Sequence, residues 1–135
     1  ITGVWCLCIS RHRTLLVFCR SAACFWYFDS MSGSSAVPAH ARAIATKLAP
    51  LVSTGSGERI DVAARSTPRQ ANGFDCGVYV LAIAEWLCTN VSGARGANET
   101  NAATTDLTTL DTLAPPAISA KRAAIDAIIR SLAGL

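Results

Sequence analysis

The sequence lacks any long hydrophobic run, although half of its residues are apolar. Its best apolar stretch, residues 78–84, ends at Glu85 and is far shorter than the ~18–20 residues that a membrane-spanning helix needs. Charge is also scarce: only 16% of residues are charged, and 12 Lys and Arg against 9 Asp and Glu leave a net charge of +3. The basic residues are scattered, with no run longer than Lys121-Arg122. We therefore expect neither a membrane span nor a nucleic-acid partner.

A signal peptide is lacking as well, since the 135-residue chain begins with Ile1 and shows no leader of basic, apolar and then small residues. We expect residues 1–135 to form a single domain and to start inside a longer protein. A hydrophobic content of 51% excludes a disordered chain. Six cysteines in such a chain indicate reduced thiols, and hence the cytoplasm or the nucleus, with a Cys19–Cys24 disulfide as a minor alternative.

Metal-binding motifs are absent too. Cys6, Cys8 and His12 are close in sequence, but no second Cys-x-x-Cys or His-x-x-x-His pair completes a ligand set. We therefore expect no metal and no other cofactor.

Three segments near the amino end are rich in β-branched and large apolar residues, which predicts three strands. They cover residues 3–10, 12–19 and 23–29, with residues 20–22 as a hairpin turn. Apolar residues at helical spacing predict helices over 37–51, 76–89 and 116–132, and a short strand is expected over 59–64. The polar stretch 91–111 is expected to be a surface loop. This order of elements predicts an α+β domain.

Several side chains have expected structural roles in these helices. Asp75 is placed to cap the helix over 76–89, where Cys88 is expected to pack as a small hydrophobe. His40 is expected to be a solvated helix residue. The apolar faces of the first and last helices consist of Ile44, Leu48 and Leu51, and of Ile118, Ile125, Ile128, Ile129 and Leu132, respectively.

Cys76 is the one cysteine at a position where reactivity is expected. It lies between Asp75 and Gly77 at the start of a predicted helix, where amide N–H groups and the positive end of the helix dipole stabilise a thiolate. Gly77 would let the backbone of a substrate come close. A buried structural thiol is the alternative interpretation. A nucleophilic thiolate also needs a base, and His12 is one of only two histidines.

The predicted hairpin supplies a partner for His12. If its turn holds two or four residues, paired residue numbers sum to an odd value such as 41 or 43, and His12 lies opposite or diagonal to Asp29 on one face. A turn with an odd number of residues would place them on opposite faces. Gln70, six residues before Cys76, can offer a side-chain N–H to an oxyanion. Alternatively, Asp29 merely ends a strand and Gln70 is an ordinary loop residue.

Three motifs contain the candidate residues in the order His, Asp, Gln and Cys. They are residues 12–17 (HRTLLV), 27–30 (YFDS) and 70–80 (QANGFDCGVYV). Together they resemble the sentrin/ULP cysteine proteases, which cleave ubiquitin-like modifiers and carry His, Asp, Gln and Cys in this order. The resemblance implies a papain-like fold of the ubiquitin-like-protease type, with a central mixed or antiparallel sheet and flanking helices. It also implies these roles for four residues: Cys76 as nucleophile, His12 as general base, Asp29 as orienting carboxylate and Gln70 as oxyanion donor.

Residues 113–122 (LAPPAISAKR) are similar to the deneddylase branch of the family, which acts on Nedd-type modifiers. The resemblance implies cleavage after the Gly-Gly end of a Nedd-type modifier, in its precursor or its conjugates. Two features of this chain differ from the pattern of the family. The family usually has Trp after the catalytic His, where this chain has Arg13, and an N-terminal helical region that this chain starts too late to contain. The alternatives are a SUMO-specific protease, a truncated non-catalytic modifier-binding remnant, and a fragment that does not fold alone.

Overall fold

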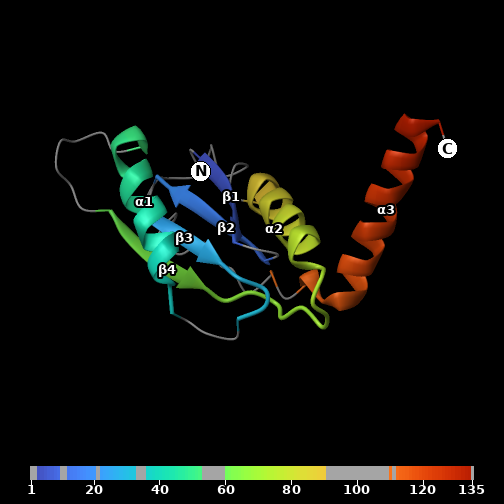
Figure 1. Cartoon of the computed structure of the whole chain (residues 1–135), viewed down its shortest axis with the longest axis horizontal. Helices are drawn as coiled ribbons and strands as arrows, with labels where there is room; N and C mark the ends of the chain where they lie inside the picture. Colours follow the sequence, from blue (N-terminus) through green and yellow to red (C-terminus); the bar gives the residue numbers. More distant parts are fainter. Residues whose placement is uncertain are drawn as a thin grey trace.

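Four strands form the centre of the molecule in a computed structural model of the chain (Figure 1). The structure describes residues 3–9 (backbone only), 12–20, 22–32, 36–52, 60–90, 110 and 112–134, so the loop expected over 91–111 lies outside the described residues except at Leu110. The described strands are β1 (Gly3–Ile9), β2 (His12–Cys19), β3 (Cys24–Phe28) and β4 (Asp61–Arg65). They pair in the order β1-β2-β3-β4; β3 and β4 run parallel and the other pairs antiparallel. Of the two expected forms, mixed or antiparallel, the sheet is therefore mixed.

The hairpin register of β2 and β3 matches one of the two predicted values. Leu15 faces Phe28 and Cys19 faces Cys24, so paired residue numbers sum to 43. The turn therefore holds four residues, 20–23, rather than the three expected. Its last residue, Ala23, has φ +44°, in the left-handed region that non-glycine residues rarely adopt. This even-numbered turn puts His12 on the same face as Asp29.

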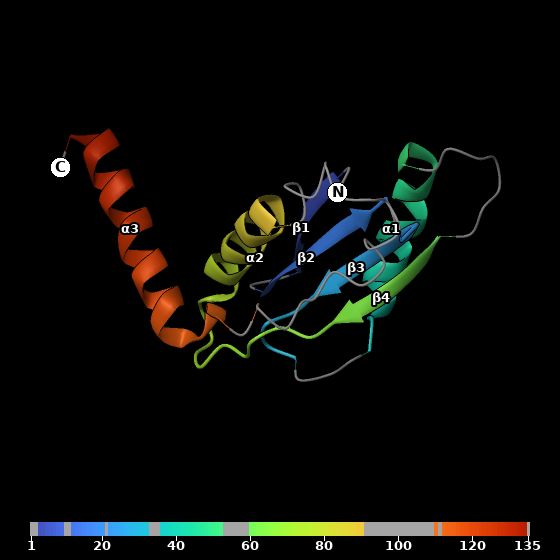
Figure 2. The same ribbon diagram turned by 180° about the vertical axis from the view of Figure 1, so that it is seen from behind.

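Helices cover both faces of the sheet (Figures 1 and 2). Alternate residues of a strand point to opposite faces, so β2 divides its apolar side chains between two clusters. Leu15 and Val17 pack with residues of α2 (Cys76–Asn90), whereas Leu16 and Phe18 pack with α1 (Ala39–Val52). Such two-sided burial explains why β2 is apolar along nearly its whole length.

The structure corrects two expectations about apolar helix faces. In α1, Leu51 is 77% exposed, because Ala41 and Ala45 are the residues that this helix turns fully into the core. The last helix, α3 (Pro115–Ala133), buries only Ile118 of its predicted face. Its second half extends away from the sheet (Figures 1 and 2), so Ile128, Ile129 and Leu132 are each more than half exposed. No described helix is long and apolar enough to cross a membrane.

Two leucines provide a matched test of this core. Leu16 is fully buried between β2 and α1, whereas Leu51 lies exposed on α1. We expect Leu16→Ala to lower the free energy of unfolding by about 2–5 kcal/mol, because it removes buried methyl groups and leaves a cavity. Leu51→Ala should change it by less than about 0.5 kcal/mol. Urea unfolding of both variants measures the difference; equal effects would contradict the packing of α1 on β2.

Candidate active site

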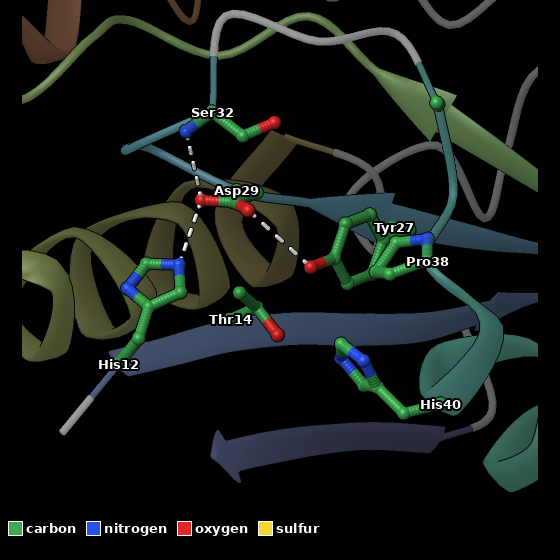
Figure 3. Close-up of a pocket in the computed structure, with 8 residues that line it drawn as sticks. His12, Thr14, Tyr27, Asp29, Ser32, Pro38 and His40 are labelled. Atoms are coloured by element: carbon green, nitrogen blue, oxygen red, sulfur yellow. Dashed lines mark hydrogen bonds and ion pairs between the residues drawn. The ribbon is translucent and has the colours of Figure 1, made fainter. Parts of the chain in front are cut away.

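The imidazole of His12 and the carboxylate of Asp29 are joined by a hydrogen bond. His12 is the first residue of β2 and Asp29 directly follows β3, so the hairpin register brings them together at one end of the sheet. His12 Nε2 lies 2.8 Å from Asp29 Oδ1 (Figure 3). Their predicted diagonal placement is thus confirmed, and 12% of the Asp29 side chain is exposed against 28% for His12.

Asp29 is held in place by more than the histidine. The backbone N–H groups of Met31 and Ser32 donate to the same oxygen, Oδ1, at 2.9 and 3.2 Å. The Tyr27 hydroxyl lies 3.4 Å from Oδ2, as Figure 3 shows. Two of these donors belong to the turn that follows β3, and the third is a side chain of β3 itself. Together they fix the carboxylate independently of its contact with the imidazole.

The second ring nitrogen of His12 determines what the pair can do. Because the carboxylate accepts a hydrogen bond from Nε2–H, a neutral imidazole here carries its lone pair on Nδ1. Nδ1 is buried and has no hydrogen-bond partner within the described part of the chain. In Figure 3 the second nitrogen points away from Asp29, on the side where α2 lies behind the ring. The pair is therefore arranged to accept a proton at Nδ1.

Cys76 is the first residue of α2 and is 1% exposed. The next residue, Gly77, lies close to Arg13, which directly follows His12. A Cβ atom on Gly77 would be 3.5 Å from Cδ of Arg13. This approach brings the start of α2 to the start of β2. His12, Asp29 and Cys76 all occupy ends of their elements, so the candidate site forms at the end of the sheet rather than on either face.

Gln70 is tied to the strand end that carries Asp29. Its backbone N–H donates to Ser30 O at 2.8 Å, and the Ser30 hydroxyl donates to Gln70 Oε1 at 2.7 Å. The side-chain Nε2 donates to the carbonyl of Asn72, which uses one of its two N–H groups. Ser30 is only 4% exposed, and its role was missed by the sequence analysis because a serine after a strand usually indicates no more than a turn.

The loop before α2 is ordered by Asn72. Its Oδ1 accepts the backbone N–H groups of Phe74 and Asp75 at 3.1 and 2.9 Å, the turn role expected for an asparagine there. Asp75 differs from expectation. Its carboxylate accepts from Asn72 Nδ2 at 2.6 Å and forms an ion pair with Arg122 of α3, and none of its contacts with other described residues is a cap on the first turn of α2.

A pocket of about 390 Å³ lies beside His12 and Asp29 (Figure 3). Its wall also contains Thr14, Tyr27 and His40. His40 was expected to be solvated, but it is half-buried and its ring faces this pocket from the start of α1. This environment could not be predicted from the sequence, because a single histidine at a helix start is compatible with either exposure or burial.

The other described thiols lie in different surroundings. Cys19 and Cys24 face each other across β2 and β3, and both are thiols. Burial raises the pKa of Cys24, which disfavours its thiolate. Cys88, expected to pack as a small hydrophobe, is exposed on α2 instead. The described residues include no group of three or more His, Cys, Asp or Glu side chains placed to hold a metal ion.

Comparison with known proteins agrees with this geometry. Residues 5–105 match the Ulp1 protease family, C-terminal catalytic domain (Peptidase_C48). The fold is similar to that of a solved structure, SUMO protease Ulp1 with the catalytic cysteine oxidized to a sulfonic acid, with a TM-score of 0.50 and 22% identity over 74% of this chain and 46% of that one. The fold and the match together define a cysteine-protease catalytic domain. The chain belongs to the Ulp1 protease family.

Two curated relatives align with a shorter part of the chain. Sentrin-specific protease 8 of Rattus norvegicus is 34% identical over 80 residues, which are 59% of this chain and 36% of the rat protein. NEDD8-specific protease 1 of Arabidopsis thaliana is 35% identical over 77 residues, which are 57% of this chain and 32% of the plant protein. The chain thus spans about a third of the length of the curated relatives that it matches.

The two tyrosines allow a test of the site by pH. Burial raises the pKa of Tyr27, with a further contribution from the Asp29 carboxylate and partial opposition from Thr14, and burial also raises the pKa of Tyr79. A phenol with a raised pKa stabilises the fold fully below the unfolded value of about 10, and this contribution is lost as pH rises through the higher folded pKa. We expect tyrosinate absorbance to appear at higher pH in the folded chain than in urea.

Because the sequence has only two tyrosines, Tyr27→Phe leaves a single transition, that of Tyr79. Folding stability should then fall less steeply above pH 10, since one of the two linked protons is gone. If the folded and unfolded chains titrated together, the burial of both phenols would be refuted.

Proposed function

We propose that this chain carries the catalytic centre of a thiol protease that cleaves after the C-terminal Gly-Gly of a ubiquitin-like modifier. The observation that supports the proposal best is the His12–Asp29 hydrogen bond, with Nδ1 left without a partner among the described residues. The approach of Gly77 to Arg13 brings the start of α2, where Cys76 lies, to the strand end that carries this pair. Family membership supports the same conclusion, because the matched region is a protease catalytic domain. The substrate would be a modifier precursor or a modifier attached to a target lysine.

In the proposed reaction His12 is the general base and Cys76 the nucleophile. Nδ1 of His12 takes the proton of the thiol, and Sγ forms a bond to the carbonyl carbon of the modifier's last glycine. The breaking C–N bond leaves its electrons on the amine, to which His12 returns the proton. His12 then deprotonates a water molecule, whose oxygen bonds to the carbonyl carbon of the thioester. The C–S bond breaks, the modifier leaves with a free carboxylate, and His12 returns the proton to Sγ. Asp29 keeps the imidazole oriented and stabilises its charged form.

Gln70 is proposed as the donor that stabilises the oxyanion formed in each step. One of its N–H groups is used by Asn72, which leaves the second for the substrate oxygen. The Cys76 backbone N–H is the second donor. Since Ser30 binds both the backbone and the side chain of Gln70, it holds this amide in a fixed relation to Asp29.

We further propose a Nedd-type modifier as the substrate, with SUMO as the alternative. The similarity to NEDD8-specific protease 1 supports the first and the fold of a SUMO protease the second. Arg13 lies beside Gly77, where its flexible cation would line the path of the modifier tail. A reducing compartment, the cytoplasm or the nucleus, fits the facing thiols of Cys19 and Cys24.

Covalent probes test the proposal directly. The full chain is incubated with Nedd-type, SUMO and ubiquitin probes that carry a C-terminal electrophile, and labelling is measured by mass shift. We expect one probe to label the chain, and Cys76→Ala and His12→Ala to abolish labelling. Cys88→Ala is the matched control, because it removes an exposed thiol of the same helix.

Labelling that survives in Cys76→Ala would contradict the assignment of the nucleophile. Reversible binding of a modifier without any labelling would favour the non-catalytic remnant instead. Failure of the chain to unfold cooperatively would favour a fragment that does not fold alone.

A second variant tests the oxyanion donor. Gln70→Ala is expected to lower the rate of turnover by about 10²–10³-fold, the usual cost of removing one such donor. Ser30→Ala should cause a smaller loss, because it only loosens the Gln70 side chain. The measurement is hydrolysis of a fluorogenic substrate derived from the modifier that the probes identify. A Gln70→Ala variant as active as the unmodified chain would refute the role.

A further inference from the structure

The carboxylate of Asp75 is a buried charge that the proposed reaction does not use. It is 5% exposed and directly precedes Cys76. A buried carboxylate is costly unless other groups compensate its charge. Two contacts do so here: Nδ2 of Asn72 donates to Oδ2 at 2.6 Å, and Arg122 forms an ion pair with Oδ1.

Arg122 reaches Asp75 from a distant part of the sequence, the first half of α3. Its guanidinium also lies over the ring of Phe74, with Cζ 4.8 Å from the ring centroid. Such a planar group can pair with a carboxylate and stack on an aromatic ring at the same time. The two contacts hold the positive charge beside the residues that lead into α2.

The next neighbour of Asp75 is the thiol that must ionise. The Cα atoms of adjacent residues are about 3.8 Å apart, so an uncompensated Asp75 charge would repel a thiolate at Cys76 and oppose the helix dipole that favours it. Arg122 offsets this repulsion while leaving Asp75 ionised and bonded to Asn72. The charge on α3 thereby affects a reaction at the start of α2.

We propose that Arg122 is a positioning residue for the nucleophile: its ion pair with Asp75 preserves the thiolate fraction of Cys76. The inference rests on the proposed function only in taking Cys76 as the nucleophile. Other described charged or titratable groups lie on α2 and on the elements next to it, and each is unchanged in the variants below. They are His12, Arg13 and Asp29 at the sheet end, Arg69 before α2, Tyr79 and Glu85 on α2, and Lys121 on α3.

The test is the rate at which iodoacetamide alkylates Cys76 as a function of pH, followed by mass spectrometry in a Cys88→Ser background. Arg122→Ala should slow alkylation at pH 7 by roughly three- to tenfold, the size expected for one neighbouring charge. Arg122→Lys keeps the charge and should retain most of the rate. Arg130→Ala is the matched control, since this arginine of α3 pairs with Asp126 on the exposed surface.

A double variant separates charge from folding. Asp75→Asn/Arg122→Ala removes both charges and should alkylate at nearly the original rate, whereas Asp75→Asn alone should react at least as fast as the double variant. If Arg122→Ala alone does not fold, the comparison of Asp75→Asn with the double variant still tests the proposal. A profile unchanged in folded Arg122→Ala, or not restored in the double variant, overturns it. Alkylation needs no modifier, so a negative probe experiment refutes the proposed function without affecting this result.

Discussion

The pairing of β2 with β3 is the constraint on which the arrangement of the site depends. A hairpin whose turn holds an even number of residues places His12 and Asp29 on one face, and a shift by one residue would separate them across the sheet. The same register alternates the apolar residues of β2 between α1 and α2, so it also sets both layers of the core. A slip that broke the His12–Asp29 pair would therefore expose buried side chains, and the stability of the core protects the geometry of the site.

Much of the fold and the contact of His12 with Asp29 could be predicted, because both depend on the spacing of residues that are near one another in the sequence. Strand β2 has the predicted bounds, and the parity of the hairpin led from residue numbers alone to the contact of His12 with Asp29. The start of α2 at Cys76 was predicted because apolar residues at helical spacing begin there, directly after a polar loop. What local spacing could not predict is which polar side chains would meet across long distances in the sequence. Ser30 with Gln70 and Asp75 with Arg122 are such pairs.

The exposure of the apolar helix faces could not be predicted from local spacing either. Periodicity predicted that Leu51 and Leu132 lie on apolar helix faces, but it cannot tell whether another element covers a face. In α1 the small residues Ala41 and Ala45 are the ones against the sheet, because they allow the helix to approach Leu16 and Phe18 closely. His40 likewise faces a pocket that only the assembled hairpin and helix create.

Two consecutive residues attach α3 to the helix that carries Cys76. Lys121 pairs with Glu85, whose side chain is 61% exposed, whereas Arg122 pairs with the Asp75 side chain, which is 7% exposed. Dissolved ions screen an exposed pair far more than a buried one. Rising ionic strength should therefore loosen the two attachments unequally. The Glu85 contact should weaken first, because the Asp75 carboxylate is buried even though the Arg122 side chain is 44% exposed. The helix would then be held mainly by Arg122 and Ile118, so salt could alter the motion of α3 while leaving the surroundings of the nucleophile nearly unchanged.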